Sequence, residues 1–208
     1  MKTTVVEFKK RSLLLLVTVL ILCSSFISMV ISPIKLGVES NHSTIQFTVP
    51  IANGITKVTG KFTEYEMDID YDSINFTNSK ISLIIRAESI NTGILGRDEH
   101  LRTADFFDTE TYPTITFMSS SITEGPNGTY VMEGDFSMHG ITKKMEVPLT
   151  PTGKDGNYTL GFSSELSLSR TDFGVGDNFQ HTSMDNFIGD EIAIEIYFWT
   201  KKWKEPQK

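Results

Sequence analysis

The segment from Gly96 to Pro113, "GRDEHLRTADFFDTETYP", gathers the side chains of this sequence that could do chemistry. It holds two arginines, a histidine and five acids beside a pair of phenylalanines. A brief helix over Arg97 to Thr103 would place Asp98 against Arg102 at a spacing of i, i+4. Guanidinium groups beside aromatic surface can hold a phosphate or carbonyl head group at the mouth of an apolar cavity.

A second cluster, "SRTDFGVGDNF" from Ser169 to Phe179, repeats this combination of arginine, acid and phenylalanine. We therefore expect the two clusters to form the polar mouth of a ligand site with the following residues: Arg97, Asp98, His100, Arg102, Arg170 and Asp172. The alternative is an ion-pair lattice that braces one end of the fold, with Phe106 and Phe107 as a plug. The residue types leave both interpretations open.

Metal and catalytic chemistry have less support. Four histidines are far apart and lack an HExxH or paired-His spacing, so no metal site is predicted: they are His42, His100, His139 and His181. No G-x-S-x-G motif indicates a nucleophile, and no cofactor is expected. The enzyme hypothesis that stays open takes His100 as an acid or base oriented by Asp98.

Eight runs of alternating apolar and polar residues would have to position these clusters. They are "STIQFTV", "KVTGKFTEYEMDIDYD", "KISLIIRAES", "TITFMSSSIT", "TYVMEGDFSMHG", "KKMEVPLTP", "NYTLGFSSELSLSR" and "EIAIEIYFWT". Gly60 in the second run suggests a bend or bulge there. Because closure removes the edges of such a sheet, we predict an all-β fold, a single antiparallel barrel of about eight strands with one short helical segment in a connection.

A barrel of this size can hold its own side chains or one slim ligand. The aromatic and thioether side chains of the runs and clusters would suit an adaptable apolar lining. The predicted lining is Phe47, Phe62, Phe106, Phe107, Phe117, Met132, Phe136, Phe162 and Phe173. The alternative is a structural or interaction module whose interior is filled by an ordinary core.

The first 37 residues differ from the remainder and predict export. Three basic residues precede an apolar run from Leu13 to Leu22, which is the layout of a secretory signal. The run continues weakly to Ile31, so an uncleaved membrane anchor is an alternative, and lipidation of Cys23 is another. We assign residues 1–37 to the signal or anchor with a linker and residues 38–208 to the barrel, in an extracytoplasmic location, periplasmic or secreted.

The predicted barrel domain is acidic and has no cysteine. Residues 38–208 hold 14 Lys+Arg against 25 Asp+Glu, a formal charge of −11. This balance argues against nucleic acid as a partner, which usually requires a basic face. The domain must be held by its core without an internal disulfide, and its oligomeric state is left open, a dimer included.

The charged segment also carries a family resemblance. "TGILGRDEHLRTADFFDTETYPTITFMS" resembles the signature of the YceI-like family, approximately T-G-x-x-x-R-D-x-H-L-R-x-x-D-F-F-D-x-x-x-Y-P-x-I-x-F. The matching residues are Thr92, Gly93, Arg97, Asp98, His100, Leu101, Arg102, Asp105, Phe106, Phe107, Asp108, Tyr112, Pro113, Ile115 and Phe117. The likeness continues in "VTGKF", "MEGDFSMHGITKKMEVPL" and "SRTDFGVG" and covers about Val38 to Trp199.

The resemblance implies a lipocalin-like antiparallel barrel around a long hydrophobic channel. It also implies non-catalytic binding of an isoprenoid lipid, such as a polyprenyl phosphate or a quinone, as the ligand and partner. The resemblance supplies no list of head-group contacts. The site residues above therefore rest partly on the geometric argument.

Overall fold

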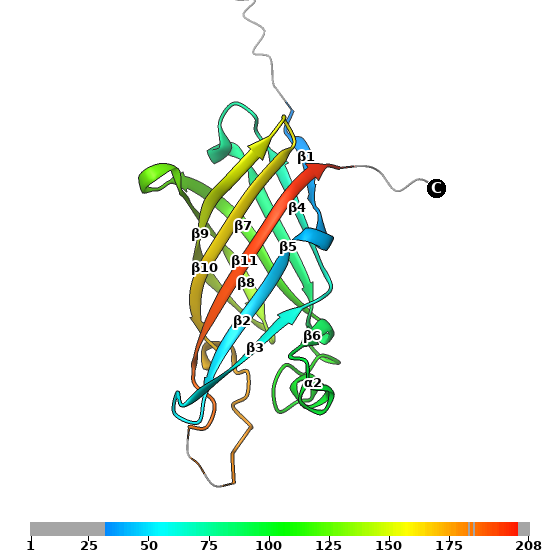
Figure 1. The fold of residues 1–208 in the computed structure, drawn as a ribbon, viewed down its shortest axis with the longest axis vertical. Helices are drawn as coiled ribbons and strands as arrows, with labels where there is room; N and C mark the ends of the chain where they lie inside the picture. Colours follow the sequence, from blue (N-terminus) through cyan, green and yellow to red (C-terminus); the bar gives the residue numbers. More distant parts are fainter. Residues whose placement is uncertain (1–31, 183, 185, 204–208) are drawn as a thin grey trace, which may run out of the picture. The chain divides into compact units, whose positions relative to one another are not determined.

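The computed structural model describes residues 32–182, 184 and 186–203. The described residues from Pro33 onward form one compact unit, in which the strands are antiparallel and make one sheet (Figure 1). They are β1 (Ile34–Val38), β2 (Thr44–Ile51), β3 (Thr56–Phe62), β4 (Tyr65–Tyr71), β5 (Lys80–Arg86), β6 (Ile90–Asn91), β7 (Thr114–Glu124), β8 (Tyr130–Met138), β9 (Ile141–Asp155), β10 (Thr159–Ser169) and β11 (Glu191–Lys202).

The sheet closes on itself because β1 pairs with both β4 and β11. The eleven strands make an eight-stranded barrel, since three strands of the barrel each consist of two pieces. Strand β11 pairs with β2 along one part of its length and with β1 along another, and β3 and β4 continue this arrangement on the next strand. Strands β5 and β6 form the third broken strand, beside β4 and β3. The predicted eight-stranded antiparallel barrel is confirmed.

The breaks in the three composite strands lie beside one another. At one break the Thr63 N–H and hydroxyl both donate to the Ser89 carbonyl, at 3.2 and 3.1 Å, and the Arg86 N–H donates to the Glu64 carbonyl. These bonds satisfy backbone groups that would otherwise lose their ladder partners. The interruption falls at Thr63 and Glu64, whereas Gly60, where we expected a bend, lies inside β3.

The described barrel begins earlier in the chain than predicted. Strand β1 starts at Ile34, and Leu36 in its middle is fully buried, so the barrel takes in residues that the sequence analysis assigned to the linker. The signal, anchor and Cys23 predictions concern residues outside the described ranges. Within those ranges, no helix has both the length and the apolar character needed to cross a bilayer.

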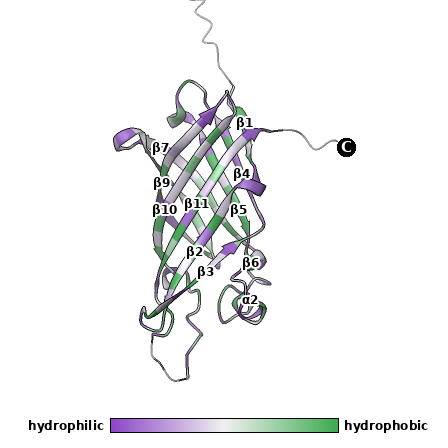
Figure 2. Ribbon diagram, viewed as in Figure 1, coloured by the Kyte–Doolittle hydropathy of each residue, from purple (hydrophilic) through white to green (hydrophobic). Residues whose placement is uncertain are grey.

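Apolar and polar residues alternate along the strands, as Figure 2 shows, because successive side chains point to opposite faces of a sheet. In β5, for example, Ile81, Leu83 and Ile85 are buried while Lys80 and Arg86 are exposed. The inward-facing side chains of all the strands form one apolar core inside the barrel.

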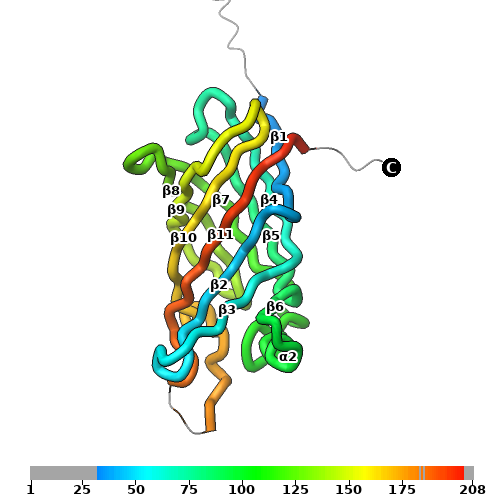
Figure 3. The backbone as a smooth tube through the Cα atoms, viewed as in Figure 1, coloured from blue at the N-terminus to red at the C-terminus, as the bar shows by residue number. Residues whose placement is uncertain are grey.

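The two ends of the barrel are built differently. At one end the segment between β4 and β5 brings Phe76 over the interior, where it stacks on Phe162 with ring centroids 5.3 Å apart and contacts Tyr130 at 4.6 Å. At the other end lie α2 (Leu95–Arg102), the β2–β3 hairpin and the segment after β10 (Figures 1 and 3). Helix α2 confirms the short helical segment predicted in one connection.

Candidate functional site

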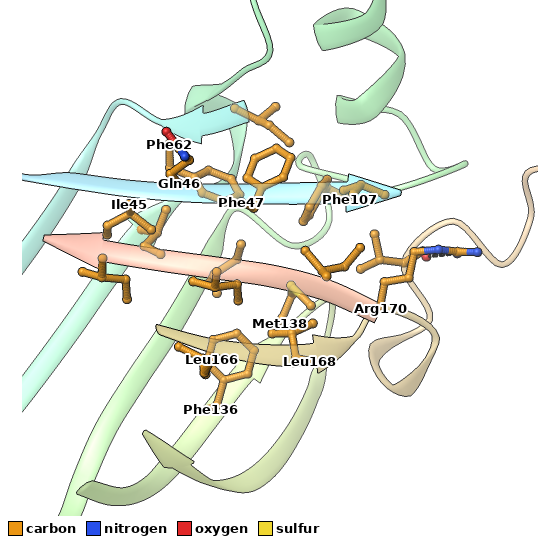
Figure 4. A pocket seen from close by; sticks show the side chains of 18 of the residues that line it. Ile45, Gln46, Phe47, Phe62, Phe107, Phe136, Met138, Leu166, Leu168 and Arg170 are labelled. Carbon is orange, nitrogen blue, oxygen red and sulfur yellow. Dashed lines mark hydrogen bonds between the residues drawn. The ribbon is translucent and has the colours of Figure 1, made fainter. Parts of the chain in front are cut away.

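The barrel encloses an apolar cavity of about 420 Å³ (Figure 4). This volume lies within the range of about 300 to 1,000 Å³ typical of small-molecule sites. Inward-facing residues of β2, β3, β10 and β11 form much of the wall, and residues beyond α2 and β10 border it at one end. The aromatic cluster around Phe76 closes the other end, because Phe162 and Phe198 pack together at 5.4 Å and Phe198 itself borders the cavity.

The structure brings most of the predicted apolar lining into this cavity. Six of the predicted phenylalanines and one methionine border it: Phe47, Phe62, Phe106, Phe107, Phe117, Met132 and Phe136. They come from strands at opposite sides of the barrel and from the segment that follows α2. Their contact with a ligand stays a prediction.

Two predicted lining residues lie elsewhere. Phe162 faces inward as expected, but it belongs to the aromatic cluster beyond the closed end of the cavity. Phe173 is 2% exposed and packs edge-on against Phe136 at 5.2 Å, with the Lys143 Nζ atom 5.4 Å from its ring centroid. Phe173 therefore supports the wall from behind Phe136 instead of forming it.

The lining also contains residues that the sequence analysis did not select. Met67, Met138 and Met145 add flexible thioether side chains, which can follow the shape of an irregular apolar ligand. Figure 4 shows Leu166, Leu168 and Arg170 following one another along the end of β10. The period-2 pattern of β10 would have identified both leucines.

Thr92, Gly93, Arg97 and Asp98 form a compact unit at the start of α2. Gly93 has φ +79°, a value that glycine adopts without strain. The Asp98 carboxylate, 5% exposed, accepts hydrogen bonds from the Thr92 N–H at 2.8 Å and from the Thr92 hydroxyl. The Arg97 Nε donates to the Thr92 hydroxyl oxygen at 2.7 Å and Nη2 donates to the Thr92 carbonyl at 3.1 Å. These bonds fix the turn that leads into the helix.

Arg97 and Arg170 both border the cavity, whereas Asp98, Arg102 and Asp172 do not. The Arg102 Nε and Nη2 donate to the carbonyls of Glu88 and Ile90, at 2.7 and 3.0 Å. Asp172 is exposed and pairs with Lys143 at 2.9 Å. The predicted polar mouth therefore contains three of the six proposed residues, Arg97, His100 and Arg170.

Arg170 ties down the segment that joins β10 to β11. Its Nε donates to the Gly189 carbonyl at 3.1 Å, Nη1 to the Val175 carbonyl at 2.7 Å and Nη2 to the Ile188 carbonyl at 3.3 Å. All three guanidinium nitrogens are thus engaged with backbone acceptors. This geometry makes Arg170 a brace at the open end of the barrel.

The enzyme hypothesis required His100 to pair with Asp98, but the two side chains do not pair in the structure. Its Nε2 lies 2.9 Å from Oδ2 of Asp105, and both side chains are about half exposed. The Asp98 carboxylate is instead held by Thr92. One turn of helix separates Asp98 from Arg102 as predicted, but they do not pair either, because each is bonded to backbone or hydroxyl groups.

The arginines do brace this end of the barrel, but they do so through hydrogen bonds and not through the ion pairs that the bracing interpretation expected. None of the ion pairs within the described ranges uses an arginine. The arginines of both clusters donate to oxygen atoms of the backbone or of a hydroxyl. Phe106 and Phe107 border the cavity and do not fill it as a plug.

Asp190 completes the bracing beside Arg170. Burial alone would raise the pKa of Asp190, but hydrogen bonds from Thr171 and Ser169 and the nearby Arg170 charge hold it below its ordinary value. Its carboxylate accepts from the Thr171 N–H at 3.0 Å, the Thr171 hydroxyl at 2.7 Å and the Ser169 hydroxyl at 2.8 Å. The ionised form is therefore the one that fits this turn.

Two further polar residues border the cavity, Gln46 and Ser164, and the sequence analysis selected neither of them. Ser164 on β10 is 4% exposed, and its hydroxyl has no hydrogen-bond partner among the residues that the structure describes. The signal was present in the sequence, because Phe162, Ser164, Leu166 and Leu168 share the inward face of this strand. A serine is the exception in that series.

The sequence of this chain is similar to that of known proteins. The family model of the YceI-like domain matches residues 37–199. A UPF0312 protein from Shewanella sp. (strain ANA-3) is 30% identical over 141 residues, which cover 66% of this chain and 73% of that protein.

Two solved structures share the fold. BcnA from Burkholderia cenocepacia superposes with a TM-score of 0.69 at 23% identity and covers 78% of this chain and 98% of its own. A polyisoprenoid binding domain from Saccharophagus degradans, implicated in plant cell wall breakdown, superposes with a TM-score of 0.68 at 15% identity and covers 82% and 99%.

Proposed function

Since the chain belongs to the YceI-like family, we propose that its barrel binds a long-chain isoprenoid lipid, such as a polyprenyl phosphate or an isoprenoid quinone, without transforming it. The name of the Saccharophagus degradans neighbour, a polyisoprenoid binding domain, supports this ligand class. The barrel acts outside the cytoplasm, where the predicted N-terminal signal or anchor would direct it.

The observation that carries the proposal is the apolar cavity of about 420 Å³ inside the barrel. Its walls consist mostly of aliphatic, aromatic and thioether side chains, which suit a hydrocarbon chain and offer few polar groups to a sugar or peptide. Removing apolar surface from water contributes about 25 cal/mol per Å², before the cost of ordering the ligand is subtracted. The driving force for binding should therefore increase with each prenyl unit that enters.

A phosphate head group would meet Arg97 at the open end. The Arg97 Nη1 has no hydrogen-bond partner among the described residues, while Nε and Nη2 hold Thr92. Arg170 is less suited to the role because all three of its nitrogens donate to carbonyls. A guanidinium can donate its free N–H groups to a phosphate while it keeps its structural hydrogen bonds.

A titration with isoprenoid alcohols of increasing chain length tests the proposal. The alcohols share one small head group, so differences in Kd report the chain. We expect affinity to rise with each added prenyl unit until the cavity is filled and then to level off. Binding that is absent, or that does not change with chain length, would contradict the proposal.

A further inference from the structure

The hydroxyl of Ser164 is an unpaired polar group in the wall of a mostly apolar cavity. Ser164 is 4% exposed, and its oxygen makes no hydrogen bond within the described part of the chain. Serine hydroxyls in strands usually donate to a nearby carbonyl or reach water, so a buried hydroxyl without a partner is uncommon. An alanine or valine would suit an empty or hydrocarbon-filled cavity better at this position.

Ser164 lies deep in the cavity. Along the inward face of β10 it follows Phe162, which belongs to the aromatic cluster at the closed end. Leu166 and Leu168 separate it from Arg170 at the open end. Its cross-strand partner on β11, Ile196, also borders the cavity.

The surroundings of Ser164 restrict what could bind its hydroxyl. The charged and imidazole side chains that border the cavity are Arg97, His100 and Arg170, and they belong to the segments at the open end. A phosphate beside Ser164 would therefore be buried without a cation, which is strongly unfavourable. A neutral acceptor such as a carbonyl oxygen needs one donor, and Ser164 supplies one.

Resting on the proposed function, we propose that Ser164 is the anchor for a neutral carbonyl-bearing end group of the isoprenoid ligand. The lipid lies with its carbonyl end at the closed end of the barrel and its hydrocarbon chain directed toward Arg97 and Arg170. The site thereby selects an isoprenoid quinone, or another isoprenoid that ends in a neutral carbonyl, over a polyprenyl phosphate. Specificity arises because the analogue without the carbonyl leaves the buried hydroxyl unpaired.

The experiment compares Ser164→Ala with the unchanged full chain against three probes that carry the same prenyl chain. The probes are an isoprenoid quinone, the hydrocarbon without an end group and the prenyl monophosphate. Ser167→Ala is the matched control, because Ser167 is the next serine after Ser164 along β10 and lies exposed on the outer face. Affinities are measured by calorimetry after removal of co-purified lipid, together with the Tm of the empty proteins.

We expect Ser164→Ala to weaken binding of the quinone by about five- to tenfold, the usual effect of losing one neutral hydrogen bond. Binding of the hydrocarbon should be unchanged, and the Tm of the empty protein should be unchanged or raised. The quinone should also bind the unchanged protein more tightly than the monophosphate. Ser167→Ala should behave as the unchanged protein with every probe.

Three results would overturn the inference. If Ser164→Ala weakens all three probes equally and lowers the Tm of the empty protein, Ser164 is a structural residue. If the quinone loses no affinity, the carbonyl end is not bound at Ser164, although isoprenoid binding in the barrel would stand. Failure of every probe to bind the unchanged protein would remove the proposed function together with this inference.

Discussion

The ring of Phe47 on β2 lies against the backbone of Gly60, its cross-strand partner on β3. A Cβ added at Gly60 would come within 2.4 Å of the Phe47 Cζ atom, far inside normal contact. Phe47 borders the cavity, so the absence of a side chain at Gly60 sets how far this ring can withdraw from the interior. Gly60 therefore controls the width of the cavity and does not mark a bend in the strand.

The substitution Gly60→Ala should push the Phe47 ring toward the cavity and weaken isoprenoid binding. Overpacking of this kind costs about 1 to 3 kcal/mol of folding stability, and a narrower cavity should lower affinity by about tenfold. Calorimetry and thermal unfolding measure the two effects. Adding Phe47→Leu to Gly60→Ala should restore both in part, because the shorter side chain relieves the contact.

Gly153→Ala is the matched control for Gly60→Ala. Gly153 lies on β9 with no heavy atom within 4 Å of an added Cβ, so its substitution should leave stability and binding unchanged. Equal affinity of Gly60→Ala and the unchanged protein would show that the Phe47 ring has no influence on the ligand.

Replacing Arg170 should destabilise the protein more than it weakens binding. Arg170→Met removes three hydrogen bonds to the carbonyls of Gly189, Val175 and Ile188 but keeps part of the apolar stem. Each lost hydrogen bond leaves a carbonyl without its partner unless water replaces it. We therefore expect the free energy of unfolding to fall by about 2 to 4 kcal/mol in total. Thermal unfolding gives the stability, and titration below the unfolding temperature gives the affinity per folded molecule.

Arg86→Met is the control for this change, because Arg86 is exposed and its side chain has no partner within the described residues. It should alter neither quantity. A large loss of affinity for a prenyl phosphate in Arg170→Met, with unchanged stability, would restore Arg170 as a head-group residue.

Asp190 should make the stability of the barrel depend on pH at the acid end. The pKa of its carboxyl is lowered in the folded protein, so the ionised group stabilises the fold above the ordinary value of 3.8 and this contribution is lost as the pH falls through the folded pKa. Asp190→Asn should therefore lower the Tm at about pH 7 by more than at about pH 3.

Asp155→Asn serves as the comparison for Asp190→Asn. Asp155 is exposed at the end of β9 and accepts no side-chain hydrogen bond from a described residue. Its Tm difference from the unchanged protein should be small at both pH values. Equal losses for Asp190→Asn at both pH values would mean that the shape of the side chain, and not its charge, holds the turn.

The barrel and its inward faces could be predicted because the side chains of a strand alternate between its two faces, so apolar and polar residues alternate in the sequence. The alternation changes phase at the break between β3 and β4, since Phe62 is buried before it whereas Met67 and Ile69, at odd spacing from Phe62, are buried after it. This break was therefore present in the sequence as a change of phase, and the sequence analysis missed it because it took the two strands as one run. Strand β1 was missed because its five residues lie at the end of the part of the chain that was assigned to the signal or anchor and its linker.

The depth of a residue along the barrel axis is not encoded by alternation. Phe162 has the expected face but lies at the level of the aromatic cluster, outside the cavity. The hydrogen-bond partners of the arginines could not be predicted from the sequence either. Arg102 and Arg170 donate to backbone carbonyls, and every residue has a backbone carbonyl. Ser164 could have been found as a polar residue in an apolar series.

Native mass spectrometry of the purified full chain tests the central claim, that the cavity holds a long apolar lipid. The variant Leu166→Trp should fill the cavity, because Leu166 borders it, while Ser167→Trp places the same ring on the exposed outer face of β10. We predict that the unchanged chain and Ser167→Trp carry a lipid with an isoprenoid mass, or take one up when it is added, and that Leu166→Trp does neither while staying folded. An unchanged chain that neither retains nor takes up an isoprenoid, or a Leu166→Trp variant that binds it as well, would contradict the account.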